Sequence, residues 1–170
     1  YPGGPEVSKL ANKARSESLP HKAKFTRPMI NSNDLNFSFS GLKTAVLYYI
    51  RDITNNGETA LTPEDKTDIA REFEDSVVDI LLKKTKSAIE EREVKTLIIA
   101  GGVIANKKIS EEFSKFEKEF GDLKFLIPNK NLTGDNSLMI AGAAYINICL
   151  NPEIIKENKN IIAKGNLKLQ

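Results

Sequence analysis

The segment from Thr96 to Ile109 constrains the fold most, because an apolar run passes into a helix through paired glycines. Residues 97–100 are continuously apolar, which is typical of a strand covered on both faces, as parallel strands are. Gly101 and Gly102 allow a sharp turn and a close approach by a ligand, since neither carries a Cβ atom. Asn106 then opens a helix whose apolar residues recur at helical spacing, namely Ile109, Phe113, Phe116 and Phe120.

A turn of this kind suits a nucleotide. The N-terminus of the helix offers unpaired N–H donors, and the glycines leave room for the flat or phosphate parts of the ligand. The Asn106 amide has the chemistry to hydrogen-bond a polar edge of the nucleotide. A tight strand-to-helix connection that binds nothing explains the same residues, so both interpretations stay open at this point.

Size and charge place broad limits on function. The 170 residues fit one domain with a real core, and a hydrophobic content of 40% is ordinary for a globular protein. The chain has 25 Lys and Arg residues against 23 Asp and Glu residues. This near-neutral balance gives no overall field for nucleic acid, so any RNA contact must come from local arrangement.

Cysteine content and hydropathy indicate a cytoplasmic protein. The single cysteine, Cys149, lies in an apolar helical run, so we exclude an internal disulfide and predict a buried thiol in a reducing compartment. The longest apolar stretch, Leu138 to Leu150, is too short to cross a bilayer, and no signal peptide heads the chain. We expect no association with a membrane.

The first third of the chain predicts two helices joined by a loop. Pro2 to Pro5 reads as a rigid turn, followed by a short helix from about Glu6 to Arg15. Residues 19–36 read as an extended loop, because prolines and polar residues alternate there. The alternation over Phe37 and Phe39 then passes into a helix through Ala45, Leu47 and Ile50.

A long helix is predicted from Thr62 to about Glu91. Pro63 suits its first turn, and Asp65 completes a capping-box pattern with Thr62. The expected buried face consists of Ile69, Phe73, Val77, Ile80 and Ala88. We assign no chemistry to the carboxylates at positions 74 and 75, because solvated or dipole-favoured carboxylates are the default within a helix.

The remaining elements are too few for a complete sheet. Gly121 is expected to end the Phe-rich helix, and residues 123–127 to form a second strand. The order strand, helix, strand predicts a right-handed parallel crossover. A polar turn over residues 134–136 precedes a last helix, and a polar tail begins at Asn151. Because two strands and four or five helices do not make a well-covered sheet, we expect part of a larger protein whose preceding residues are absent.

Four blocks in this order resemble one family. They are YPGGP at residues 1–5, NFSFSGLKT at 36–44, FEDSVVD at 73–79 followed by AGGVIAN, and TGDNSLMIA at 133–141. The sequence resembles the C-terminal half of the TsaD family, the tRNA N6-adenosine threonylcarbamoyltransferases formerly called glycoproteases or O-sialoglycoprotein endopeptidases. The resemblance covers residues 1–150, which we expect to form a C-terminal lobe, and leaves 151–170 as a polar C-terminal tail.

The resemblance implies an α/β fold, the C-terminal lobe of an actin, Hsp70 and sugar-kinase-like (ASKHA) fold, mostly helical with a small, incomplete parallel sheet. It implies transfer of threonylcarbamoyl from threonylcarbamoyl-AMP to N6 of the adenosine 3′ of the anticodon in tRNAs that read ANN codons. The implied partners are tRNA, TsaB-like and TsaE-like proteins, and the N-terminal half of the same protein. We expect the chain alone to be inactive.

The resemblance also assigns residues to the adenine nucleotide. Gly4 matches a glycine that packs against the bound nucleotide, with a strained turn glycine as the alternative. Asn106 matches an adenosine-contacting asparagine, which is compatible with a role as helix N-cap. Gly101 and Gly102 match the floor of the nucleotide pocket, or else only permit the turn. Ser8 stands where some members carry an acidic residue near the ribose.

One metal ligand is implied. The family binds one Fe²⁺ or Zn²⁺ ion per intact protein through two histidines of an HxxxH motif and an aspartate, which here matches Asp135. The two histidines have no counterpart, because His21 is the only histidine and lies in a Pro-rich loop. Capping of the helix that begins near Ser137 is the competing role for Asp135.

Other interpretations remain at this stage. Lys43 either faces tRNA phosphate or is a solvated surface lysine, and no general base is identified. A sugar-kinase-like phosphotransferase would share the adenosine turn, and a non-catalytic nucleotide-binding or scaffold lobe would explain the absent HxxxH motif. Metalloprotease activity lacks support, because an HExxH site requires two histidines.

Overall fold

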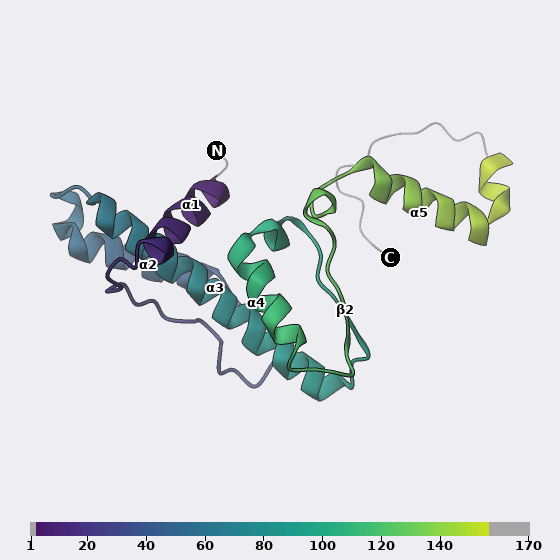
Figure 1. Cartoon of the computed structure of the whole chain (residues 1–170), viewed down its shortest axis with the longest axis horizontal. Coiled ribbons are helices and arrows are strands. Elements are labelled where there is room, and N and C mark those ends of the chain that lie inside the picture. Colours follow the sequence, from purple (N-terminus) through teal and green to yellow (C-terminus); the bar gives the residue numbers. More distant parts are fainter. Residues whose placement is uncertain (1–2, 157–170) are drawn as a thin grey trace. The chain divides into compact units, whose positions relative to one another are not determined.

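The structure is a computed structural model that describes residues 3–156, and its contacts divide the chain into two compact units at Thr133 and Gly134. Figure 1 shows the elements, which we treat unit by unit. The first unit contains the helices α1 (Gly3–Ser16), α2 (Ser40–Ile53), α3 (Pro63–Arg92) and α4 (Lys107–Glu117), and the strands β1 (Thr96–Ile98) and β2 (Lys124–Leu126). Short 3-10 helices lie at Asn55–Gly57, Gly102–Ala105 and Lys130–Leu132. The second unit contains α5 (Ser137–Leu150) and a 3-10 helix at Pro152–Lys156.

The helix α3 is the longest element of the first unit, and its start matches the prediction. The Thr62 hydroxyl accepts a hydrogen bond from the backbone N–H of Asp65, and the Asp65 carboxylate accepts one from the backbone N–H of Thr62. This reciprocal capping box satisfies two N–H groups that would otherwise lack partners. Of the predicted buried face, Ile69 and Ile80 are buried, while Phe73, Val77 and Ala88 are half-buried.

Two hydrophobic clusters pack against successive parts of α3. The first contains Val78 and Ile89 of α3 together with Ile104, Ile109, Phe113 and Phe116, so α4 and the segment before it cover this part of the helix. The second joins Ile69 of α3 to Leu42 of α2 and to the loop residues Ala23 and Phe25. The Phe25 and Tyr49 rings meet edge to face with centroids 5.5 Å apart. The helix α3 therefore forms the common floor of both clusters.

The strands β1 and β2 pair in parallel, which confirms the predicted parallel arrangement. Leu97 lies opposite Phe125, and both pack against the first cluster. On the other face, Ile98 is 68% exposed and Leu126 is 41% exposed. Both strands are shorter than predicted, and the expectation of burial on both faces is wrong within the first unit, because one face of this sheet has no cover there.

The beginning of α1 corrects the predicted turn. Gly3, Gly4 and Pro5 form the first helical turn instead of preceding the helix, whereas Pro2 lies outside the described residues. A proline fits there because the N–H groups of the first turn have no intrahelical partner, so its missing N–H costs nothing. The predicted loop over residues 19–36 is confirmed, and it continues without a strand through Phe37 and Phe39.

The helix α4 ends earlier than predicted, at Glu117. The backbone N–H groups of Lys118, Glu119 and Phe120 each bond to the carbonyl three residues back. These tighter bonds replace the α-helical pattern, and Gly121 follows in a turn. Phe120 still packs against the first cluster. Its spacing from Phe116 therefore correctly indicated burial, although the α-helix does not continue to Phe120.

The second unit consists of an apolar helix with no buried residue of its own. The side chain of Asn136 accepts a hydrogen bond from the Met139 N–H and caps α5. Cys149 is exposed, so the prediction of a buried thiol is wrong for the described unit. None of the described helices is both long and apolar enough to span a membrane. Most of the predicted tail, residues 157–170, lies outside the described residues.

We expect Thr62→Ala to lower the free energy of unfolding by about 1 kcal/mol at neutral pH, because an N-cap is lost. Hydrogen bonds from the Thr62 hydroxyl and then from its backbone N–H lower the pKa of Asp65 below the ordinary 3.8. A lowered folded-state pKa contributes stability above the unfolded pKa that is lost as the pH falls through the folded value. Urea unfolding of the full-length protein at pH 7 and at acid pH is the measurement.

Thr59→Ala is the control for this prediction, because Thr59 is an exposed residue just outside the capping box. It should change the unfolding free energy little at either pH. A cost for Thr62→Ala that stays constant as the pH falls below the pKa of Asp65 would contradict the coupled capping box.

Candidate functional site

The predicted glycine turn is present between β1 and α4. Gly101 adopts φ 94° and ψ 171° and precedes the 3-10 helix Gly102–Ala105, which the sequence did not predict. Asn106 follows and caps α4, since its side-chain oxygen accepts a hydrogen bond of 3.0 Å from the Ile109 N–H. The N-cap alternative for Asn106 is therefore confirmed.

The glycines of the site differ in whether the backbone conformation requires a glycine at that position. Gly101 has a positive φ, which residues with a side chain rarely adopt. Gly4 and Gly102 have no positive φ, and a Cβ atom built on either would meet nothing within 4 Å. The alternative of a strained turn glycine is therefore wrong for Gly4. The fold of the first unit does not require glycine at either position, and both are exposed.

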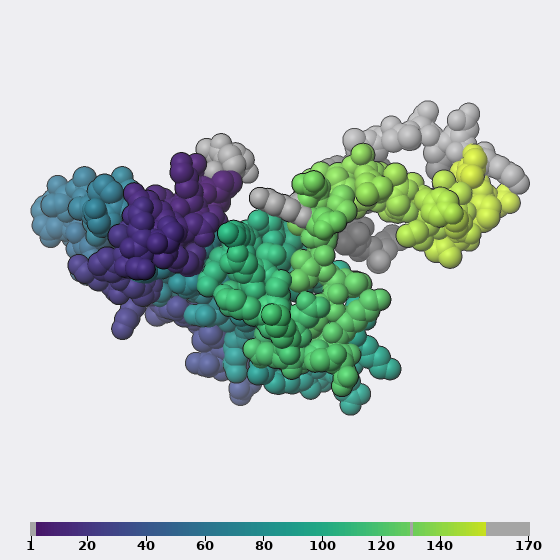
Figure 2. Space-filling model, in the orientation of Figure 1, coloured from purple at the N-terminus to yellow at the C-terminus, as the bar shows by residue number. Residues whose placement is uncertain are grey.

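Asn106 joins the turn to α1. Its amide nitrogen donates to the Ser8 hydroxyl at 2.8 Å and to a carboxylate oxygen of Glu74 at 2.6 Å. Ser8 lies four residues after Gly4, so the two share one face of α1. In Figure 2 the purple N-terminal residues adjoin the green residues of the α4 region on the drawn face. The face of α1 that carries Gly4 thus borders the N-terminus of α4.

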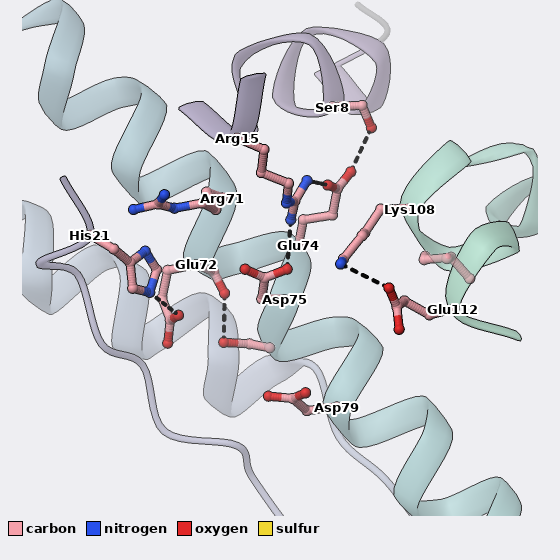
Figure 3. Close-up of polar contacts among 12 residues, drawn as sticks. Ser8, Arg15, His21, Arg71, Glu72, Glu74, Asp75, Asp79, Lys108 and Glu112 are labelled. Carbon is pink, nitrogen blue, oxygen red and sulfur yellow. Dashed lines mark hydrogen bonds and ion pairs between the residues drawn. The ribbon is translucent and has the colours of Figure 1, made fainter. Parts of the chain in front are cut away.

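Glu74 is the centre of this junction. It is buried in α3, and one carboxylate oxygen accepts from the Ser8 hydroxyl at 2.9 Å as well as from Asn106. The other carboxylate oxygen accepts from the Arg15 guanidinium at 2.5 Å, and Arg15 also binds Asp75 at 2.6 Å. Figure 3 shows Arg15 reaching from α1 to both carboxylates. The expectation of a solvated or dipole-favoured carboxylate is wrong for Glu74, because its side chain is buried and paired with Arg15.

The Arg15 guanidinium remains a cation in this setting. Burial lowers the pKa of Arg15, but hydrogen bonds to Glu74 and Asp75 and their negative charges outweigh it, so the pKa is raised above its ordinary value. A buried carboxylate is costly unless it is paired and hydrogen-bonded. Glu74 meets both conditions, through Arg15 on one oxygen and through Ser8 and Asn106 on the other.

The sequence around Glu74 carries a signal of its burial. Ala70 and Val78 lie one helical turn before and after Glu74, and both are buried. A glutamate between small or apolar residues at this spacing lies on the inner face of a helix. Its partner Arg15 is 59 residues away, so the sequence alone did not indicate what pairs with it.

Two further buried carboxylates, Asp68 and Glu72, hold the loop before α2. Asp68 accepts hydrogen bonds from two successive backbone N–H groups, those of Lys22 and Ala23, and Glu72 accepts one from Phe25. The His21 ring lies between these carboxylates, 3.2 Å from Asp68 and 3.1 Å from Glu72. His21 is therefore part of the loop attachment, and Figure 3 shows it facing α3.

The buried lysine of α3 holds a third segment. Lys84 donates to the backbone carbonyls of Ser32 and Asp34 and to the Ser32 hydroxyl, at 2.7 to 3.1 Å. A polar cavity of about 310 Å³ opens beside this contact. It is lined by Ile30, Asn31, Ser32, Asn33, Asp34, Lys83, Ser87 and Glu91 and does not include the glycine turn.

Asp135 belongs to the second unit and is exposed. The capping alternative for Asp135 is wrong, because Asn136 is the N-cap of α5. Among residues 3–156, no hydrogen bond or ion pair engages Asp135, and no group of three His, Cys, Asp or Glu side chains is placed to bind a metal. One carboxylate does not fit a transition-metal ion by itself. Lys43 is exposed on α2.

Comparisons with known proteins agree on one family. The family model described as TsaD, tRNA N6-adenosine threonylcarbamoyltransferase, matches residues 1–142. A protein of this name from Thermosipho africanus strain TCF52B is 40% identical over 169 residues, which are 99% of this chain and 47% of that protein. Its namesake from Lactococcus lactis subsp. cremoris strain SK11 is 38% identical over 167 residues, 98% of this chain and 46% of that protein.

A third relative of the same name, from Herminiimonas arsenicoxydans, is 38% identical over 160 residues, 93% of this chain and 44% of that protein. The chain spans about half the length of the curated relatives it matches. Because the family model covers most of its residues and the relatives align along nearly all of it, the chain belongs to the TsaD family.

Proposed function

We propose that this chain is part of a tRNA N6-adenosine threonylcarbamoyltransferase. The whole protein would transfer threonylcarbamoyl from threonylcarbamoyl-AMP to N6 of the adenosine 3′ of the anticodon in tRNAs that read ANN codons. Family membership supports the reaction class. The observation that carries the proposal is the glycine turn ending at Asn106, which Ser8 joins to the face of α1 that bears Gly4.

The reaction forms one bond and breaks one. The adenine N6 amine of tRNA attacks the carbamoyl carbon, a C–N bond forms, and the C–O bond of the mixed anhydride breaks. AMP leaves with the bonding electron pair, and N6 loses a proton. The role we assign to this chain is to bind the adenosine part of the adenylate, and we assign no general base to its residues.

The site residues have the properties that this role needs. Gly4 and Gly102 leave open space at the surface, where the absent side chains would allow close approach by a base or ribose. Asn106 is half-buried and retains one unused acceptor position on its side-chain oxygen, beyond the bond from Ile109. The first turn of α4 adds the partial positive charge of a helix N-terminus.

We infer that the chain is one lobe of a two-lobed actin, Hsp70 and sugar-kinase-like fold. Support comes from the uncovered sheet face with Ile98 and Leu126, since parallel sheets are ordinarily covered on both faces. The N-terminal half of the protein, tRNA, and TsaB-like and TsaE-like proteins are the proposed partners, in the cytoplasm.

We propose Asp135 as one ligand of an iron or zinc ion in the full-length protein. It is exposed, and no hydrogen bond within the described residues engages its carboxylate. A catalytic transition-metal site ordinarily has about three protein ligands. The other ligands would therefore have to come from outside this chain.

Asn106→Ala in the full-length protein should weaken AMP binding by about 1 to 3 kcal/mol, because a partly buried hydrogen-bonding group is lost. Calorimetric titration with AMP is the measurement. Asn106→Ser is the matched variant, since serine also caps helices well but does not reach as far. Both variants should lose affinity, while only the alanine variant should lose the cap. Unchanged affinity in a folded alanine variant would leave only the capping role.

Substitutions of the three glycines distinguish an effect on nucleotide binding from an effect on folding. Gly101→Ala should destabilise the protein by about 1 to 2 kcal/mol because of its positive φ. Gly4→Ala and Gly102→Ala should leave the melting temperature unchanged or higher, because their added Cβ atoms meet nothing, yet they should weaken AMP binding. If these two variants bind AMP normally, the open space beside them does not hold the nucleotide.

The transfer assay tests the proposed function itself. Full-length protein, incubated with threonine, bicarbonate, ATP, unmodified tRNA and the partner proteins, should yield threonylcarbamoyladenosine. Asp135→Ala should abolish product and retention of iron or zinc, measured by elemental analysis, and Asn136→Ser should retain both because serine also caps helices. The isolated chain should give no product until the N-terminal half is added. Product from the chain alone would contradict the proposal that it is only part of the site.

A further inference from the structure

We propose that Glu74 is a positioning residue that fixes Ser8 and Asn106 as hydrogen-bond acceptors toward the ligand. The inference rests on the proposed function, in which Asn106 contacts the adenosine part of the substrate. It implies that the ligand group in contact with Ser8 and Asn106 donates a hydrogen bond. It follows from the hydrogen-bonding capacity of three side chains and from the distances between them.

The orientation of the Asn106 amide is fixed from two sides. A carboxylate paired with Arg15 has no proton to donate, so the Asn106 atom that lies 2.6 Å from Glu74 must be the amide nitrogen. The side-chain oxygen then faces the N–H of Ile109, which can only donate. If the amide were flipped, its oxygen would face the Glu74 carboxylate and one of its N–H groups would face the backbone N–H of Ile109. Both ends therefore require the same orientation.

This orientation uses both amide hydrogens of Asn106. One is directed to Glu74 and the other to the Ser8 hydroxyl, at 2.6 and 2.8 Å. What remains for a ligand is the second lone pair of the side-chain oxygen. In this state Asn106 accepts a hydrogen bond from the ligand and does not donate one.

Ser8 is restricted in the same way. Its hydroxyl proton is directed to Glu74 at 2.9 Å, and its oxygen already accepts from Asn106. The remaining lone pair of the hydroxyl oxygen is again an acceptor. Ser8 and Asn106 are both half-buried, so a ligand can reach either. Together they offer two acceptors and no donor.

Because Ser8 and Asn106 offer only acceptors, only the hydrogen-bond donors of adenosine can pair with them. The donors of the nucleoside are the ribose hydroxyls and the exocyclic N6 amine, whereas the ring nitrogens and the phosphate oxygens are acceptors. A site built of hydrogen-bond acceptors binds an analogue without the matching donor more weakly, because its buried polar groups are then left unpaired. The ligand group that meets Ser8 and Asn106 is thus a hydroxyl or an amine.

The test compares nucleotide analogues by calorimetry in the full-length protein. The ligands are AMP, 2′-deoxy-AMP, 3′-deoxy-AMP and purine riboside 5′-monophosphate, which has hydrogen in place of the N6 amine and gains no new donor. The wild type should bind one of the three analogues about tenfold more weakly than AMP, and that analogue identifies the donor. Equal affinity for all four would overturn the inference without any variant, so a variant that fails to fold leaves it testable.

Glu74→Gln should reduce the discrimination between AMP and that analogue from about tenfold to less than about threefold, because a glutamine amide can donate to Asn106 and release its orientation. Asp75→Asn is the matched control. It disturbs the same Arg15 but contacts neither Ser8 nor Asn106, so the full discrimination should remain. A purely structural role would lower the affinity for all ligands equally in both variants, and that result would overturn the inference.

The outcome for Asn106→Ala separates the two proposals. If AMP binding is unaffected by Asn106→Ala, the nucleotide role of the site fails. If Asn106→Ala weakens AMP binding but Glu74→Gln keeps the full discrimination, only the positioning role of Glu74 fails.

Discussion

The structure of the first unit depends on the burial of carboxylates along α3. A buried carboxylate is stable only when it is paired and hydrogen-bonded, so each one requires its partners in defined places. Glu74 requires the Arg15 guanidinium and thereby fixes α1 against α3. Glu72, two residues earlier on the helix, accepts from the backbone of Phe25 and from Arg27 and so fixes the long loop before α2. The two hydrophobic clusters pack against the same helix.

The same requirement explains why the candidate site is assembled from distant parts of the sequence. Ser8 lies 66 residues from Glu74 and 98 residues from Asn106, yet all three meet at one carboxylate. The glycine turn could form locally in many proteins. Here, Asn106 at the N-cap of α4 is held against α1, and Glu74 dictates the orientation of its side-chain amide. Binding and specificity at the turn are therefore expected to depend on the packing of α1 against α3.

The sequence predicted the features that local chemistry determines. The capping box at Thr62, the glycine turn and the cap at Asn106 each involve residues within a few positions of one another, and all are present. The four motif blocks identified the family correctly. Features set by distant residues were missed. The burial of Glu74 depends on Arg15, which lies 59 residues away in the sequence. The exposed sheet face depends on cover that the first unit does not supply.

A crystal structure of the full-length protein with bound AMP would test the proposed site most directly. We expect a hydroxyl or amine of the nucleotide to lie within hydrogen-bond distance of the side-chain oxygen of Asn106, while the Asn106 amide nitrogen stays on Glu74. A nucleotide bound away from Gly4, Gly102 and Asn106, or an Asn106 amide that has turned its nitrogen from Glu74 to the nucleotide, would contradict it.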